Sequence, residues 1–176
     1  IIISMIPAVF IGLFFEEEIE ILFTGNITLV GSMLIITGIL LLLTKLSKEK
    51  RHQISYSHSF IVGLSQAFAI IPGISRSGAT ICTSLLLGNN KKQSAKFSFL
   101  MVIPLIFGKI IKDLFSDNID FNNIDYMVYI FGFFSAFITG LFACKLMLKI
   151  VKNNSLNIFS AYCIILGLIS IIITSF

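Results

Sequence analysis

Long apolar runs separated by short charged segments dominate the chain. Residues 1–15, 27–44, 126–144 and 153–176 contain no charged side chain and are mainly apolar. A helix that crosses the hydrocarbon core of a bilayer needs about 20 such residues. The pattern therefore predicts membrane spans at about 1–15, 27–46, 126–146 and 155–176, the first of them the tail end of a longer run.

One further span is predicted at about 95–115, although it carries charged side chains. Lys96, Lys109 and Lys112 have long apolar stems, so their ammonium groups can reach the membrane surface. Pro104 lies inside this span and is expected to kink the helix, which membrane helices tolerate.

The segments between the spans alternate in charge. Acidic residues occupy two predicted loops and basic residues occupy three connections. The acidic loops hold Glu16, Glu17, Glu18 and Glu20, and Asp113, Asp117, Asp120 and Asp125; the basic connections hold Lys45, Lys48, Lys50 and Arg51, then Lys91, Lys92 and Lys96, then Lys145, Lys149 and Lys152. The positive-inside rule places the basic connections in the cytoplasm and the C-terminus outside.

Composition supports the same fold class. Of 176 residues, 56% are hydrophobic and 12% charged, whereas about a quarter are charged in an ordinary soluble domain. We therefore expect an all-α, polytopic membrane helix bundle that forms a single transmembrane domain over residues 1–176. The net charge of +4 does not indicate a nucleic-acid partner, because the basic residues lie in short connections between apolar runs.

Small residues in the apolar runs are interpreted as packing positions. Gly31 and Gly38, like Gly132 and Gly140, are spaced to let helices approach closely. Cys82, Cys144 and Cys163 have no metal-ligand spacing and are expected in the core. Because Ile1 lies inside an apolar run, we expect the chain to be the later part of a longer protein.

The segment between Arg51 and Lys91 does not fit a simple span. Basic residues flank it on both sides, so the chain must cross the membrane an even number of times. Pro72-Gly73 divides it into halves of roughly 15 and 11 residues, or about 22 and 16 Å of helix, each too short for a core of about 30 Å. The sequence therefore predicts a re-entrant helical hairpin over 57–88.

The predicted hairpin tip carries the chemistry of the chain. It reads Pro72-Gly73-Ile74-Ser75-Arg76-Ser77-Gly78-Ala79-Thr80, and Arg76 is its one charged residue. A cation at that depth costs at least about 2.5–3.5 kcal/mol, so Arg76 should have an anionic partner, either on chain outside this sequence or as a bound anion.

The residues around Arg76 favour a bound phosphate-type anion. Ser75 or Ser77 is placed to cap the second half-helix, whose N-terminus would then present free N–H groups. Ser75, Ser77 and Thr80 add hydroxyl groups, and Gly78 permits close approach of an oxyanion. Gln66 and Gly73 are candidates to line the site, although a hydrogen bond between helices is the alternative role for Gln66. The guanidinium fork suits phosphate oxygens. The alternative is an interfacial turn from which Arg76 reaches lipid headgroups.

At this tip the sequence resembles the undecaprenyl-diphosphate phosphatases of bacteria, the bacitracin-resistance family. Besides the PGxSRSxxT-like tip, the resemblance includes Met5-Ile6-Pro7-Ala8-Val9, Gly63-Leu64-Ser65-Gln66-Ala67, Phe97-Ser98-Phe99-Leu100 and Ile103-Pro104. It implies hydrolysis of undecaprenyl diphosphate to the monophosphate in the bacterial inner membrane, which recycles the lipid carrier for peptidoglycan synthesis and confers bacitracin resistance. It also implies two inverted repeats with re-entrant hairpins, a homodimer and a divalent cation, Mg²⁺ or Ca²⁺.

The resemblance assigns diphosphate binding and catalysis to Arg76, with Ser75, Ser77, Gly78 and Thr80 around it. Two features depart from the family pattern. The family's first motif, paired glutamates followed by a Ser/Thr-Gly-His element, belongs before residue 1, and Tyr162-Cys163 replaces a frequent Tyr-Arg.

The chain offers no convincing catalytic base, so we expect it to be inactive alone. His52 lies in a basic connection, His58 begins the hairpin about 20 Å from its tip, and an unactivated Ser75 is a weak nucleophile. Two other functions stay open: a transporter or flippase for a lipid-linked phosphate, since broken half-helices that face anions are a transporter device, and a purely structural membrane subunit.

Overall fold

The computed structural model describes residues 1–48, 53–115, 126–153 and 156–175. Over these residues the chain is helical and has no strand, which confirms the all-α prediction. Four helical stretches are long and apolar enough to cross a membrane: Ile27–Leu46, Lys91–Phe115, Tyr126–Lys152 and Asn157–Thr174. The chain is therefore a multi-pass membrane protein. Six residues that the sequence analysis placed in loops or connections lie outside the described residues: Lys50, Arg51, His52, Asp117, Asp120 and Asp125.

The first acidic segment is a helix, and its interpretation as a loop was wrong. Helix α1 spans Ile2–Phe14, and α2 follows at once over Glu16–Leu22. Three glutamates occupy the first turn of α2, where negative side chains interact favourably with the positive end of the helix dipole.

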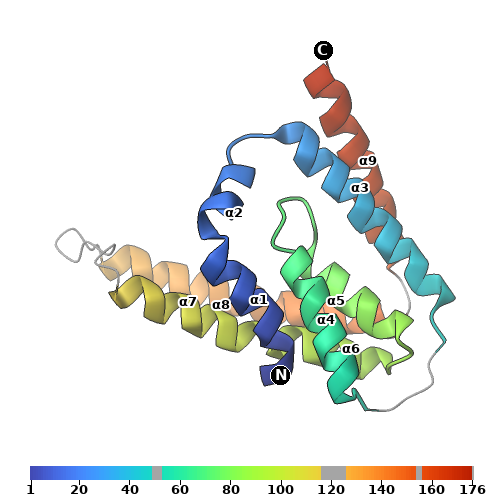
Figure 1. The fold of residues 1–176 in the computed structure, drawn as a ribbon, viewed down its shortest axis with the longest axis horizontal. Coiled ribbons are helices and arrows are strands. Elements are labelled where there is room, and N and C mark those ends of the chain that lie inside the picture. The colour runs from blue at the N-terminus through green and yellow to red at the C-terminus, as the bar shows by residue number, and fades with distance from the viewer. Residues whose placement is uncertain (49–52, 116–125, 154–155, 176) are drawn as a thin grey trace.

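Helices α3 (Ile27–Leu43) and α9 (Asn157–Ser175) lie side by side (Figure 1). Glycines allow the close approach: a Cβ on Gly31 would lie 2.9 Å from the carbonyl oxygen of Gly167. The buried Ser160 hydroxyl donates to the carbonyl oxygen of Gly38 at 2.6 Å. The packing role of Gly31 and Gly38 is confirmed. α3 continues into the short 3-10 helix η1, Thr44–Leu46.

Two short helices form the predicted hairpin. Helix α4 spans Tyr56–Phe68 and α5 spans Arg76–Leu86, with 13 and 11 residues, so they are only about 20 and 16 Å long. Pro72-Gly73 lies in the connection between them. That connection lies between α3 on one side and α1 and α2 on the other (Figure 1).

A buried polar network closes the foot of this hairpin. His58 Nδ1 lies 2.9 Å from Asn89 Oδ1, Asn89 Nδ2 donates to Ser84 Oγ at 3.1 Å, and Ser84 Oγ lies 2.7 Å from Ser94 Oγ. Asn89, Ser84 and Ser94 are almost fully buried. The network ties α4 and α5 to the next helix and gives His58 a structural partner.

The span predicted at 95–115 is two helices, and it begins earlier than expected. Helix α6 spans Lys91–Leu100 and is capped by Asn90, and α7 spans Val102–Phe115. Pro104 has no N–H to donate to the carbonyl of Leu100, four residues before it, and its ring crowds that carbonyl. The sequence predicted a kink at Pro104, and the structure instead has an interruption of the helix between Leu100 and Val102.

Helix α8, Tyr126–Lys152, lies at the periphery of the described bundle. Its side chains are exposed until the last turn, where Val151 joins the core. Among the described residues, a Cβ on Gly132 or Gly140 would meet nothing within 4 Å, so within this part of the chain their assignment to helix packing was wrong. Cys144 is likewise exposed, whereas Cys82 and Cys163 are buried in the core as expected.

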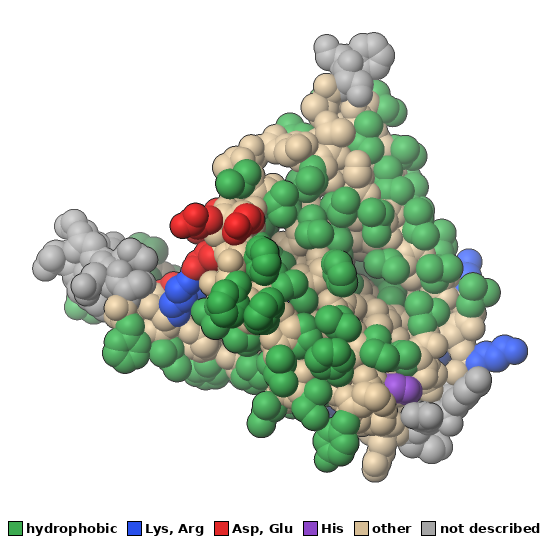
Figure 2. Space-filling model, in the orientation of Figure 1, with side chains coloured by type: hydrophobic (Ala, Val, Ile, Leu, Met, Phe, Trp, Pro, Cys, Tyr) green, Lys and Arg blue, Asp and Glu red, His purple; other side chains and the backbone are tan. Residues whose placement is uncertain are grey.

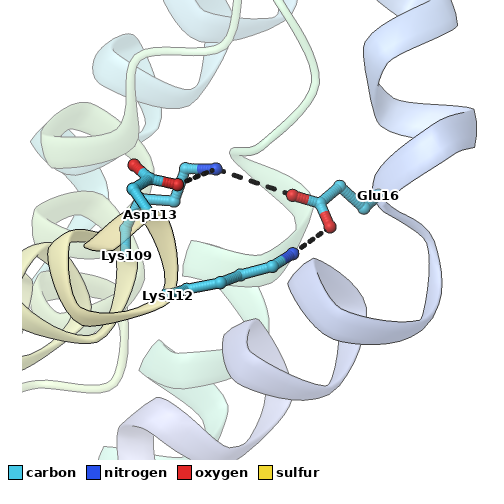
Figure 3. Close-up of polar contacts among 4 residues, drawn as sticks. All are labelled: Glu16, Lys109, Lys112 and Asp113. Carbon is cyan, nitrogen blue, oxygen red and sulfur yellow. Dashed lines mark hydrogen bonds and ion pairs between the residues drawn. The ribbon is translucent and has the colours of Figure 1, made fainter. Parts of the chain in front are cut away.

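Hydrophobic side chains cover most of the face seen in Figure 2, and acidic ones gather over α2. An ion-pair cluster joins α2 to α7 there (Figure 3). Glu16 accepts a hydrogen bond from Lys112, and Lys109 Nζ lies 3.6 Å from Glu16 and 3.1 Å from Asp113. The bond from Lys112 holds the pKa of Glu16 below its usual value, so Glu16 keeps its negative charge until the pH falls through that lowered pKa.

The contact between α1 and α4 provides a test of this fold. A Cβ on Gly63 would overlap the carbonyl oxygen of Ser4, which is backbone and cannot turn aside. We expect Gly63→Ala to cost about 1–3 kcal/mol and to lower Tm in detergent. Gly132→Ala is the matched control, because it adds the same methyl group in open space. Equal melting temperatures for the two variants would contradict the packing described here.

Candidate anion-binding site

Ser75 ends the hairpin connection and starts α5. Its Oγ accepts a hydrogen bond from the N–H of Gly78 at 3.1 Å, so Ser75 rather than Ser77 is the cap. Arg76 is consequently the first residue of α5. The backbone N–H groups of Arg76 and Ser77 have no protein partner among the described residues, and they point out of the helix at its positive end.

Thr37 on α3 holds the connection in place. Its hydroxyl accepts from the N–H of Ser75 at 3.1 Å and donates to the carbonyl of Gly73 at 3.2 Å. Gly73 has φ +95°, and a Cβ there would lie 2.5 Å from the carbonyl oxygen of Val30. Only glycine fits so close to α3 in that conformation. Sequence reasoning missed Thr37, although a hydroxyl in the middle of a long apolar run was a usable signal.

Arg76 is half-buried, and its side chain turns toward α4. Its Nη2 donates to Gln66 Oε1 at 2.5 Å. Gln66 is 2% exposed, and its Nε2 has no hydrogen-bond partner among the described residues. Because a guanidinium only donates, the amide oxygen must face Arg76 and the amide nitrogen must point elsewhere. A buried donor without a partner costs about 1–3 kcal/mol, which an acceptor in the site would recover.

Gln66 and Arg76 line a cavity of about 430 Å³ between α1, α4 and α7. Its other walls are apolar, with Ala8 and Leu105 among them, except for Lys109. No carboxylate lines this cavity within the described part of the chain, and Arg76 has no ion pair there. The cavity therefore combines two cations and a free amide donor with no resident anion.

The other residues that were predicted to form the site lie near Arg76 but do not line its cavity. Thr80 is buried, and its hydroxyl bonds to the carbonyl of Arg76 at 2.9 Å and to Ser98 Oγ at 2.6 Å, so it faces α6. Ser77 is half-buried and Gly78 is buried in the first turn of α5. Neither they nor Gly73 line the cavity of Arg76 and Gln66. The structure thus brings Arg76 and Gln66 together.

Catalytic bases and metal ligands are not gathered at this cavity. His58 bonds to Asn89 at the foot of the hairpin. Within the described ranges no three His, Cys, Asp or Glu side chains are grouped so that they could hold a metal ion. These residues do not fit a divalent cation by themselves, so no chemical step is assigned to one here.

Comparison with known proteins identifies the family. The sequence model of bacitracin resistance protein BacA matches residues 1–169. The chain belongs to this family. An undecaprenyl-diphosphatase of Christiangramia forsetii is 54% identical over 172 residues, which cover 98% of this chain and 65% of that protein. One from Bacteroides fragilis is 43% identical over 178 residues, 99% of this chain and 67% of that protein.

Relatives with the same name are also found in Methanococcus. An undecaprenyl-diphosphatase of Methanococcus maripaludis is 44% identical over 166 residues, covering 93% of this chain and 64% of that protein. The chain therefore spans about 65% of the length of the curated relatives it matches. The family resemblance seen in the sequence is confirmed, and neither a transporter nor a structural subunit is favoured by these relatives.

Replacing Thr37 tests whether α3 positions this BacA site. Thr37→Val keeps the shape of the side chain but leaves the N–H of Ser75 without its acceptor, so we expect a loss of about 1–3 kcal/mol in local stability. Hydrogen exchange at the amide of Ser75 should accelerate. Thr37→Ser keeps the hydroxyl and should leave that exchange unchanged. Slow exchange in Thr37→Val would contradict the positioning role.

Proposed function

We propose that the complete gene product hydrolyses undecaprenyl diphosphate to undecaprenyl phosphate and inorganic phosphate, and so recycles the lipid carrier for peptidoglycan synthesis. The observation that carries the proposal is the pairing of Arg76 with Gln66 in a cavity without a carboxylate. That arrangement suits an oxyanion with several acceptors, and the names of the relatives supply the class of substrate.

The residues of this chain would bind and neutralise the diphosphate. The guanidinium of Arg76 can donate two parallel hydrogen bonds to phosphoryl oxygens, and Nε2 of Gln66 can donate to a third in the same cavity. Water adds to the terminal phosphorus, and the bridging oxygen leaves with the prenyl phosphate. Negative charge on the transferred group is spread over oxygens that these donors face, which lowers the barrier.

Acid–base help and a divalent cation, Mg²⁺ or Ca²⁺, would come from parts of the complete protein outside these residues. On this proposal the 176-residue chain alone binds the headgroup but does not turn it over. The homodimer implied by the family resemblance stays a prediction.

We propose the bacterial inner membrane as the site of action, with the basic connections in the cytoplasm and the C-terminus outside. The ion pairs of Glu16 with Lys109 and Lys112 support this orientation, because they join the acidic segment after α1 to the end of α7 that also carries Asp113. The acidic segment after α1 and Asp113 then lie at one side of the membrane, opposite the basic connections.

Removal of the guanidinium tests the function. In the complete gene product, Arg76→Ala should reduce phosphate release from undecaprenyl diphosphate by about 100-fold or more, since loss of one transition-state donor costs about that much. Lys92→Ala, which removes an exposed cation at the start of α6, should retain full activity. Both variants should insert and melt like the parent protein. Normal turnover by Arg76→Ala would remove Arg76 from the site.

A further inference from the structure

The cavity beside Arg76 contains a second cation, supplied by α7. Lys109 lines this cavity together with Gln66 and Arg76, and it is the other charged residue there among the described residues. It also lines an adjoining cavity of about 370 Å³ between α1 and α7. Lys109 therefore lies where a cavity with polar donors meets a groove with mainly apolar walls, in which Glu16 and Lys112 are the other charged lining residues.

Exposed ion pairs hold the ammonium group of Lys109 beside the cavity. Its Nζ lies 3.1 Å from Asp113 and 3.6 Å from Glu16, and its side chain is 61% exposed. The other oxygen of Glu16 accepts a hydrogen bond from Lys112, so Glu16 keeps a cationic partner if Lys109 turns toward the cavity (Figure 3). An exposed ion pair of this kind is worth little, so its loss opposes that movement only weakly.

A diphosphate needs more positive charge than one guanidinium provides. Its two phosphoryl groups carry more charge and more acceptor oxygens than a single phosphate. Arg76 with the free Nε2 of Gln66 can satisfy one of the two groups. Lysine, a compact and mobile cation, can meet the second group without a fixed geometry.

We propose that Lys109 binds the phosphoryl group that Arg76 does not hold, and that it thereby makes the site prefer prenyl diphosphates to prenyl monophosphates. The proposal rests on the proposed function and specifies how the same site distinguishes its substrate from the product. The prenyl chain would leave the headgroup at Lys109 and run along the apolar groove, against Met5, Val9 and Leu13 of α1.

The test compares two lysines one helical turn apart. In the complete gene product, Lys109→Gln should raise KM for undecaprenyl diphosphate about tenfold, as expected for the loss of one charge-assisted hydrogen bond. Inhibition by undecaprenyl phosphate, which has one phosphoryl group, should stay within about twofold of the parent value. Lys109→Arg should restore KM. Lys112→Gln removes the same charge from the groove but not from the cavity of Arg76 and should raise KM less, and Lys92→Gln, outside both, should leave KM unchanged.

The following results would overturn the proposal that Lys109 binds the second phosphoryl group. An unchanged KM in Lys109→Gln, or equal weakening of diphosphate and monophosphate binding, would show that Lys109 does not read the second phosphoryl group. Equal effects of Lys109→Gln and Lys112→Gln would assign the change to the ion-pair cluster. If Lys109→Gln fails to insert, Lys109→Met is measured in the same way. If Arg76→Ala loses turnover while Lys109→Gln keeps the parent KM, the proposed function is supported and the role proposed for Lys109 is wrong.

Discussion

One constraint governs this molecule: the half-buried guanidinium of Arg76 has no carboxylate among the described residues to neutralise it. An amide oxygen from Gln66 satisfies part of its hydrogen-bonding capacity but none of its charge. Nε2 of the same amide is buried and has no acceptor in the part of the chain that the structure describes. A cation and an orphan donor on one cavity wall are each unfavourable alone, and an oxyanion relieves both. The site is therefore electrostatically arranged for an anion before any anion arrives.

The rest of the described fold keeps this arrangement in place. The connection that leads into Arg76 has little regular structure, and Thr37 supplies hydrogen bonds to its Gly73 and Ser75 that a helix would otherwise supply. Thr37 is fixed because α3 packs closely along α9 through glycines and the bond from Ser160. The buried network around Asn89 fixes the other end of the hairpin. The site thus depends on close helix contacts at some distance from Arg76.

The sequence predicted the parts of this site that depend on local structure. The re-entrant hairpin followed from Pro72-Gly73 and from the shortness of the two half-helices, and the preferences of helix N-termini narrowed the cap to Ser75 or Ser77, of which the structure selects Ser75. A kink was expected at Pro104, because proline lacks an N–H, and the structure has two separate helices there. The roles of Thr37 and Lys109, and the outward position of Cys144, depend on which helices meet in three dimensions, and no local pattern encodes that. The helical form of the acidic segment was missed because charge was taken to mean a loop.

The central claim is most directly tested by an experimental structure of the complete gene product with undecaprenyl diphosphate bound in a lipid nanodisc. The account predicts phosphoryl oxygens within about 3 Å of both the Arg76 guanidinium and Gln66 Nε2, with the hairpin tip still bound to Thr37. A structure in which Arg76 faces bulk solvent, with its hairpin flat on the membrane surface and the diphosphate bound elsewhere, would contradict it.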